Sequence, residues 1–570
     1  MAATYINSSE RMFPRGLMRF HLNSSRIIAG TAYVRRSDGW NVQEVHRASI
    51  WRHTAGTGPN GWSRQPLEPE PGGPTDLLTD PSDTLVGSLN EAGVVGGGKN
   101  WQTEPWAAQL ATPFVWTIDQ TNGNVLSGLR LGSAFQQQYY QDELIPGLVT
   151  ALGSGAAPLA GGWVGTRCSN SRPAPYVAPV SGSSHSISEL TQPILTNGFP
   201  VGASPIGSVQ AIPSGSDGLL RPLGWLKDGA CGAPNLGTCL YTANFNSWLA
   251  RWEGSGPSWS PETFGVPTSE HHAELFDSTA SLGAGYVRWF GAAQNQECMD
   301  HAAVFLAPLQ DGEAIYDIHD ALAPDALRPR SRAAAVADAL QPGINWLVAG
   351  SRYRFAQSPL AAEGDFELSR GTVWQGKPGT ASGTYEWCGR RIDEIARELS
   401  PRVTVYAITD VLPGGACVGY GQLDTFGPDL ADWGSPGGKL IVFTAAADYN
   451  GDLRVDGTDL GILLGSWGSQ DESLLLDCDN QVIDGTDLGL LLGSWASGSD
   501  VARVNWQCSK GGWHVIQPIQ AAQQAASILG FASLESLGDT LTLLSPGAAE
   551  DLAEVAGAIT EGIIQSGGTQ

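Results

Sequence analysis

Residues 448–467 read DYNGDLRVDGTDLGILLGSW, and the second part of this stretch returns almost unchanged further along the chain. VDGTDLGILLGSW (Val455 to Trp467) and IDGTDLGLLLGSW (Ile483 to Trp495) differ at two of thirteen positions and begin 28 residues apart. A repeat this close indicates two copies of one small structural unit. Each copy places acidic and amide residues before an apolar run, an order that predicts a loop followed by a helix.

The first copy has the oxygen donors that a calcium loop of the EF-hand type needs. Ca²⁺ is a hard cation that takes about six to eight oxygen ligands, which such a loop supplies from positions 1, 3, 5, 7, 9 and 12. In this numbering the donors are Asp448, Asn450, Asp452, the backbone carbonyl of Arg454, Asp456 and Asp459. Apolar side chains follow at the spacing of one helix face, namely Leu460, Leu463, Leu464 and Trp467.

Position 6 of such a loop is normally glycine, because the chain turns there with a positive φ angle. Leu453 occupies this position. A left-handed conformation costs a non-glycine residue about 1–2 kcal/mol. We therefore expect a strained turn at Leu453 and a weakened affinity for the ion.

The second copy has a loop that is one residue shorter than the first. Its acidic residues, which either bind an ion in altered geometry or bind none, are Asp477, Asp479, Asp484 and Asp487. A simpler interpretation makes Asp459 and Asp487 N-caps of two apolar helices. That interpretation does not explain the alternation of Asp448, Asn450 and Asp452.

The loop-then-helix order, aspartate rather than glutamate at position 12, and the run DLGxLLGSW resemble the dockerin type I repeat, in particular dockerin-like repeats of secreted proteins from aquatic bacteria. The resemblance covers residues 447–498 only. It implies two halves packed as a pseudo-symmetric calcium module that can dock onto a partner, with calcium at Asp448, Asn450, Asp452, Asp456 and Asp459. Dockerins usually hang at a chain end, whereas residues 499–570 follow this pair, which favours a built-in structural calcium site.

The composition narrows the class of protein. The 570 residues include 32 basic and 57 acidic side chains, a net charge of −25 that repels polyanions and argues against nucleic acid and anionic lipid as partners. There are 73 glycines and 35 prolines, and charged residues make up only 16%, against about 25% in an average chain. With 42% apolar residues and 20 tryptophans, this favours a folded, turn-rich β protein over a helical bundle or a disordered chain.

At about 100–150 residues per domain, the length predicts several domains. We expect a mainly β, multidomain chain with sandwich-like or barrel-like units and long Gly/Pro-rich loops. Strands are predicted at RIIAGTAYVRR, NVQEVHRASIWRH, LGAGYVRWFGAA, AAVFLAPL, VTVYAIT and KLIVFTA, and a helix at RRIDEIARELSPR. The predicted parts are a β-rich domain at 1–150 with a long loop at 55–100, a second β-rich domain at 151–325, a mixed α/β segment at 326–446, the dockerin-like module at 447–498 and a helical C-terminal segment at 499–570.

Other polar clusters carry weaker signals. Glu270, His271 and His272 match no metal-site spacing, and the acidic and histidine residues around His301 and His319 are expected in solvated loops. Cys231 and Cys239 form an attractive local disulfide pair, with two free thiols as an equal alternative. The sequence contains no CxxC, GxSxG or Walker A pattern and no GxGxxG after a strand, which removes the commonest thiolate-zinc, hydrolase, NTPase and dinucleotide signatures.

These features predict a non-enzymatic, calcium-stabilised structural or attachment protein of an extracellular or virion surface, most simply a phage capsid-surface or tail component. Such loops bind calcium with dissociation constants of about 10⁻⁴–10⁻³ M in extracellular modules, so calcium must be abundant. The N-terminal residues lack the order of a secretory signal, and no apolar run reaches the ~18 residues of a membrane span. Lysis is then one consistent route of release.

Expected partners are other proteins or further copies of this chain, with a carbohydrate or cell-surface receptor as a further candidate. One alternative is a secreted carbohydrate-active enzyme carrying a dockerin-like module, marked by two carboxylates about 5–9.5 Å apart in an aromatic-lined cleft. The other is a cell-surface docking protein.

Overall fold

A computed structural model shows how the chain folds. It describes residues 2–6, 19–37, 42–53, 61–67, 84–99, 112–131, 147–166, 169–180, 188–190, 206–215, 218–227, 247–255, 258–264, 271–289, 299–306, 315–325, 328, 330–340, 343–353, 369–381, 384–395, 403–423, 438–450, 452–470, 474, 476, 482–495 and 513–516.

Seven antiparallel sheets follow one another along the chain, and each is called a blade here, numbered in that order. Blade 1 contains β2 (His21–Leu22), β3 (Ile27–Ser37), β4 (Val42–His53) and β5 (Trp62–Pro66). Blade 2 contains β6 (Thr84–Leu89), β7 (Val94–Lys99), β8 (Thr112–Ile118) and β9 (Val125–Arg130). Blade 3 contains β10 (Gly147–Leu152), β11 (Leu159–Thr166), β12 (Ser169–Pro179) and β13 (Ser188–Glu189). Blade 4 contains β14 (Ile206–Ala211), β15 (Leu223–Lys227), β16 (Ser247–Ser255) and β17 (Ser258–Phe264). Blade 5 contains β18 (His271–Ser278), β19 (Leu282–Trp289), β20 (Met299–Leu306) and β21 (Ile315–Asp317). Blade 6 contains β22 (Arg330–Asp338), β23 (Trp346–Tyr353), β24 (Arg370–Pro378), β25 (Tyr385–Arg391) and β29 (His514–Ile516). Blade 7 contains β26 (Val403–Val411), β27 (Cys417–Leu423), β28 (Gly438–Thr444) and β1 (Ala2–Ile6).

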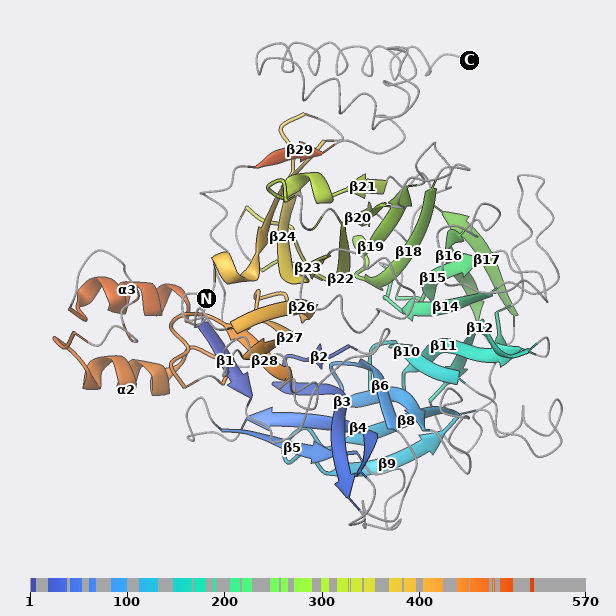
Figure 1. The fold of residues 1–570 in the computed structure, drawn as a ribbon, viewed down its shortest axis with the longest axis horizontal. Helices are drawn as coiled ribbons and strands as arrows, with labels where there is room; N and C mark the ends of the chain where they lie inside the picture. Colours follow the sequence, from blue (N-terminus) through green and yellow to red (C-terminus); the bar gives the residue numbers. More distant parts are fainter. Residues whose placement is uncertain are drawn as a thin grey trace.

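Together the blades form a seven-bladed β-propeller. The first strand of each blade contacts the first strand of the next, and β26 of blade 7 contacts β2 of blade 1, so the ring is closed. Figure 1 shows the blades in this order around the ring, from blue through green to orange. The N-terminal strand β1 completes blade 7 by pairing with β28, from Ala2 opposite Thr444 to Ile6 opposite Leu440.

One glycine in the second strand of every blade marks the repeat. These glycines lie 61–71 residues apart, at positions 30, 97, 162, 224, 285, 350 and 421. In blades 2 to 7 each pairs with the residue just before a β-bulge in the first strand. An added Cβ would lie 1.9–2.3 Å from a backbone oxygen of that strand, and at Gly30 it would lie 2.2 Å from the Phe20 ring. Only glycine therefore allows the bulged strand to approach so closely.

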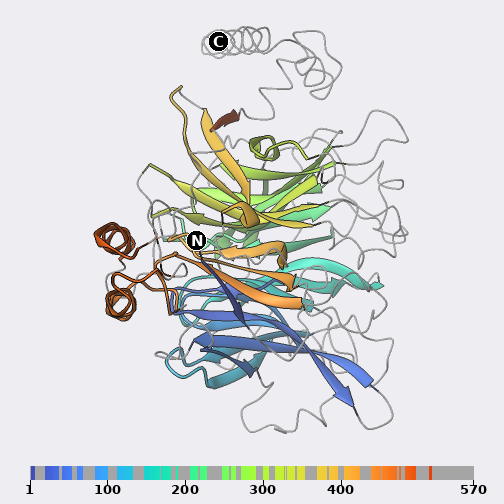
Figure 2. The ribbon, with the colours of Figure 1, turned by 60° about the vertical axis from the view of Figure 1, so that its left-hand side comes forward.

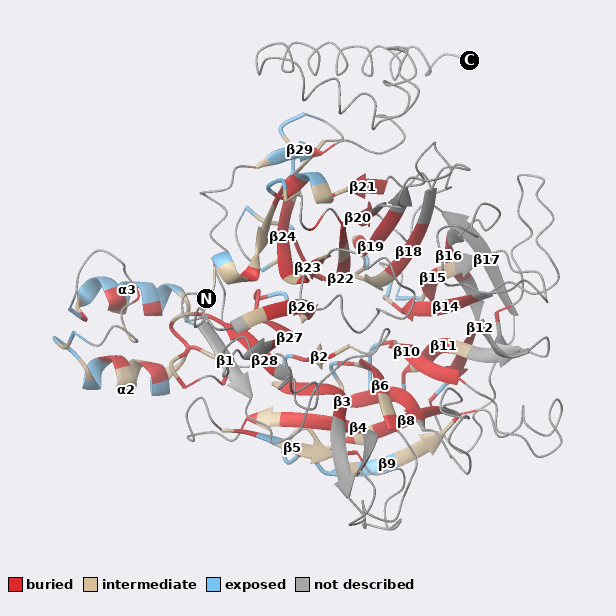
Figure 3. Ribbon diagram, in the orientation of Figure 1, coloured by how far each residue is buried: buried red, intermediate tan, exposed pale blue. Residues whose placement is uncertain are grey.

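The buried apolar side chains lie between consecutive blades. Separate clusters fill the space between blades 1 and 2, 2 and 3, 3 and 4, 4 and 5, and 5 and 6, and the largest cluster joins blades 6, 7 and 1. The prediction of a mainly β protein is confirmed, but sandwich-like or barrel-like units are wrong. A blade is a single sheet with two apolar faces, and only its neighbours in the ring can cover them. Figure 3 shows the resulting burial of the strands in red.

Most predicted strands are present, as β3, β4, β19, β20, β26 and β28. The prediction of a long loop at 55–100 is wrong, because this stretch contains β5, β6 and β7. Apolar residues of these strands belong to the buried clusters on either side of blade 1. The expected boundary after residue 150 falls inside β10. The predicted helix at RRIDEIARELSPR begins as a short 3₁₀ turn, Ile392–Glu394, and its later part lies outside the described residues, as do the C-terminal helix and the Cys231–Cys239 pair.

Candidate functional site

Two short helices lie beside each other outside the ring, after the last strand of blade 7. They are α2 (Gly457–Gly465) and α3 (Gly485–Gly493), and Figures 1 and 2 show them from two sides. Each begins with a capping box, in which the N-cap carboxylate, Asp456 or Asp484, accepts a backbone N–H of the first turn. The aspartate three residues later accepts the N-cap N–H in return. The loop-then-helix order is therefore present, and the N-caps are Asp456 and Asp484 rather than Asp459 and Asp487.

The loop before α2, residues 448–459, is called the acidic loop here. Asp448 accepts the backbone N–H groups of Asp452 at 3.0 Å and Leu453 at 2.8 Å, and also the Thr444 hydroxyl at 2.6 Å. Asp459 Oδ1 accepts the N–H groups of Tyr449 at 2.8 Å and Asn450 at 3.2 Å. Leu453 has a φ of 68°, the left-handed conformation expected at position 6.

The acidic loop buries three carboxyl groups close together. The exposed fractions are 4% for Asp448, 5% for Asp452 and 0% for Asp459, and Asn450 is exposed by 4%. Burial, together with neighbouring carboxylates, raises the pKa of Asp448 to about 8 and that of Asp459 to about 6. Buried charges need a partner or a metal ion, and these all-oxygen donors fit a hard cation such as Ca²⁺. Arg454 and Asp456 are half-buried at the rim.

A guanidinium from blade 1 reaches this loop. Arg26 Nη1 lies 2.7 Å from Asp452 Oδ2. Arg26 belongs to the turn between β2 and β3 of blade 1 and has a left-handed φ of 65°. The ion pair therefore joins the acidic loop, which follows blade 7, to blade 1 across the place where the ring closes.

Replacing this guanidinium should reveal whether a second cation can take its place. In chelator, we expect Arg26→Gln to lower the free energy of unfolding by about 1–3 kcal/mol, because Asp452 stays buried without its partner. In millimolar calcium the loss should shrink, since the ion restores positive charge beside Asp452. Denaturant unfolding in both buffers measures the difference.

Arg391→Gln is the matched control, because Arg391 pairs with Asp393 and Glu394 at the surface of another blade. Its small cost should not depend on calcium. An equal cost of Arg26→Gln with and without calcium would contradict the expectation.

The second copy preserves part of this arrangement. Asp487 is fully buried and accepts the backbone N–H groups of Leu476 at 2.6 Å and Asp484 at 2.9 Å. Asp477 and Asp479 lie outside the described residues. Occupation of this second loop by an ion therefore stays a prediction.

The two helices are packed into the propeller on one side and exposed on the other. Leu453, Val455, Leu463, Ile483 and Leu491 belong to the same buried cluster as blades 6, 7 and 1. The outward side carries six of the ten large apolar side chains that are exposed among the described residues, and they are Leu464, Trp467, Val482, Leu490, Leu492 and Trp495. Figure 3 shows this outward side in pale blue.

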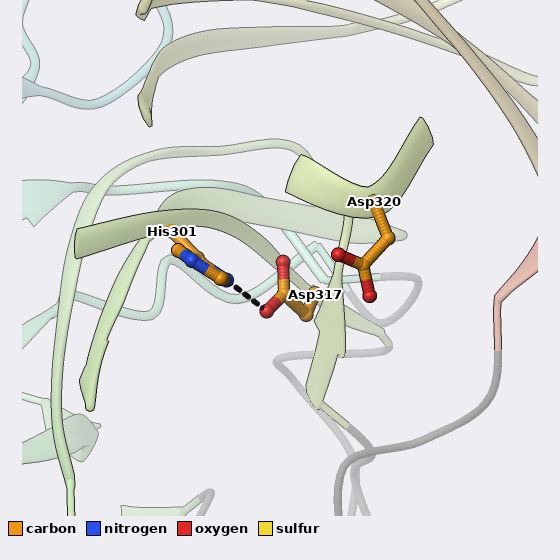
Figure 4. Close-up of side chains that lie close together, drawn as sticks. All are labelled: His301, Asp317 and Asp320. Carbon is orange, nitrogen blue, oxygen red and sulfur yellow. Dashed lines mark hydrogen bonds and ion pairs between the residues drawn. The ribbon is translucent and has the colours of Figure 1, made fainter. Parts of the chain in front are cut away.

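A second polar cluster lies at the edge of blade 5. His301 of β20, Asp317 of β21 and Asp320 of the 3₁₀ turn His319–Ala321 approach one another, and Figure 4 shows the three side chains. One ligand atom from each lies within 4.8 Å of the others. The sequence alone assigned these residues to solvated loops, which is wrong for this group. In the part of the chain that the structure describes, no other three His, Cys, Asp or Glu side chains bring their ligand atoms this close together. The carboxylates of the acidic loop therefore lie further apart, and Ca²⁺ would have to draw them together.

The charges of this second cluster are strongly coupled. Burial alone would lower the pKa of His301, but the charge and hydrogen bond of Asp317 raise it. The pKa of His319 falls to about 3 through burial and the nearby charge of His301. Loss of part of its hydration against the surrounding protein and the charge of Asp317 raise the pKa of Asp320 to about 6, although its side chain is exposed. His301 and Asp317 thus favour each other's charged forms, beside an imidazole whose pKa is strongly lowered.

Comparison with known proteins assigns no family to this chain. Neither a protein-family model nor a curated protein matches this sequence. Among solved structures, the chain is similar to a Trypanosoma rangeli sialidase in complex with the inhibitor DANA, at 10% identity and a TM-score of 0.32. The match covers 78% of this chain and 62% of the sialidase. At this TM-score the two chains do not superimpose well enough to transfer site residues.

Among the described residues, no helix is long and apolar enough to cross a membrane.

Proposed function

We propose that this chain is a non-enzymatic, calcium-stabilised β-propeller that acts on an extracellular or virion surface as a structural or attachment protein. The observation that carries the proposal is the acidic loop. Three aspartates are buried there, and Arg26 pairs with one of them, Asp452, at the place where blade 7 meets blade 1. A divalent ion in this loop would neutralise the excess charge and strengthen the closure of the ring.

The position of the loop favours a structural role for calcium over a detachable docking module. Apolar side chains within the acidic loop and after it, such as Leu453 and Leu463, are part of the largest buried cluster. An ion bound only to the folded loop would therefore stabilise the propeller as well as the two helices. The exposed apolar side of α2 and α3 supports a protein partner in the assembly.

Calcium titration of the full chain tests the proposal. With a dissociation constant of about 10⁻⁴–10⁻³ M, 10 mM calcium should stabilise the protein by about 1–3 kcal/mol and raise its melting temperature by about 1–3 °C. Asp448→Asn should abolish the rise, because it replaces the negatively charged carboxylate at position 1 with a neutral amide.

Asp338→Asn is the control, because Asp338 accepts hydroxyl groups of Thr279 and Ser281 far from the loop. It should keep the calcium response of the natural chain. If calcium left the melting temperature of the natural chain unchanged, as it should in Asp448→Asn, the proposed role of the ion would be refuted.

The carbohydrate-active alternative makes a different prediction. Such an enzyme would release sugar from a polysaccharide or glycoconjugate, and substitution of a carboxylate pair would stop the reaction. Activity against a glycan panel in calcium would replace the structural proposal with this one.

A further inference from the structure

The cluster around His301 is organised as a metal site would be, independently of the acidic loop. In a tetrahedral Zn²⁺ site, bonds of about 2.0–2.2 Å place two ligand atoms about 3.3–3.6 Å apart. The ligand atoms of His301, Asp317 and Asp320 all lie within 4.8 Å of one another. One ion could therefore contact all three side chains after small side-chain movements. Figure 4 shows the contact between His301 and Asp317, with the carboxylate of Asp320 beside it.

Contacts behind the cluster hold two of its members in place. His301 Nδ1 lies 2.6 Å from Asp317 Oδ2, and the other oxygen of Asp317 accepts the backbone N–H of His319 at 2.9 Å. The ring of His301 stacks on that of His319, with centroids 4.2 Å apart and planes 15° apart. His319 Nδ1 in turn contacts Ser331 Oγ of blade 6 at 2.7 Å. Supporting contacts of this kind orient the ligands of natural metal sites.

The third member, Asp320, leaves the cluster open to solvent. Its side chain is exposed, and no hydrogen bond joins it to another described residue. The neighbouring Asp300 does not belong to the cluster, because Arg332 and Tyr353 bind its carboxylate. An ion could thus enter from the side of Asp320 and keep a position for water.

We propose that His301, Asp317 and Asp320 bind one divalent transition-metal ion of the zinc class. An imidazole nitrogen selects such ions over Ca²⁺ and Mg²⁺, while two carboxylates supply the negative charge that a dication needs. Three protein ligands would leave one tetrahedral position of the ion to a water molecule. The site lies on blade 5, with its support on blade 6, and does not depend on the proposed calcium function.

Isothermal titration of the full chain with Zn²⁺, after removal of divalent ions by chelator and desalting, tests the proposal. The natural chain should bind one ion that Asp320→Asn binds at least about tenfold more weakly. Asp320→Asn should melt at the natural temperature, since it breaks no hydrogen bond within the described structure. Asp325→Asn, which changes a nearby carboxylate that pairs with Arg328, is the matched control and should bind Zn²⁺ like the natural chain.

Co²⁺ provides a second measurement. Visible absorption of the Co²⁺-loaded chain should show nitrogen and oxygen ligands, and His301→Gln should change that spectrum. Equal zinc affinity in the natural chain and Asp320→Asn would overturn the proposal and leave His301 and Asp317 as an ion pair. Calcium binding would be unaffected by that outcome, so the two proposals fail separately.

Discussion

Gly285→Ala is expected to destabilise the propeller by more than about 3 kcal/mol. The new Cβ would lie 1.9 Å from the backbone oxygen of Glu274, and 2.9 Å from its carbonyl carbon. Both atoms belong to β18, which cannot retreat without breaking its ladder with β19. A flexible side chain could rotate away from the methyl group, but a paired backbone cannot. Urea unfolding followed by tryptophan fluorescence measures the loss.

Gly461→Ala in α2 is the matched control for this substitution. Nothing lies within 4 Å of a Cβ added at Gly461. Alanine is a better helix former than glycine by about 1 kcal/mol, so this variant should be as stable as the natural chain or slightly more stable. If both variants unfolded at the same urea concentration, the close approach of β18 and β19 would not explain the glycine.

Asp459→Ala should destabilise the acidic loop by at least about 3 kcal/mol, because three backbone donors lose their acceptor. These donors are the N–H groups of Tyr449, Asn450 and Asp456. Asp459 is fully buried, so water cannot easily replace its carboxylate. Hydrogen exchange should show faster exchange at these amides, and calcium should no longer slow it.

Asp487→Ala tests the equivalent position of the second copy. Asp487 accepts the backbone N–H groups of Leu476 and Asp484. Its loss should leave the amides of the acidic loop protected, because these two donors lie in the second copy. A cost of Asp459→Ala within the ~0.5 kcal/mol of an ordinary surface substitution would show that the loop does not depend on this carboxylate.

Local sequence patterns located individual strands but not the ring. The alternation in NVQEVHRASIWRH and the apolar run KLIVFTA indicated β4 and β28. The arrangement of the sheets depends on contacts between blades, and the periodicity within one strand carries no information about these contacts. A signal was nevertheless present, because Gly30, Gly97 and their five counterparts recur every 61–71 residues. The surrounding residues vary so much that this period is hidden beside the close repeat at 455–495.

The acidic loop was partly predictable for the opposite reason. Its donors lie within twelve consecutive residues, so spacing alone identified the candidates and the left-handed position at Leu453. Arg26 could not be found in this way, because 426 residues separate it from Asp452. The same limit hid the cluster of His301, Asp317 and Asp320, since a hairpin and a 3₁₀ turn bring these residues together.

The pairing of β1 with β28 has a consequence for biosynthesis. During synthesis β1 leaves the ribosome long before its partner strand β28, which follows all the intervening blades in the chain. Until then the N-terminal segment has no ladder to join, and the open ring exposes the unpaired edge of β28 as soon as that strand folds. Capture of β1 should be a late step, and a chaperone that shields this edge during translation would reduce misassembly between neighbouring chains.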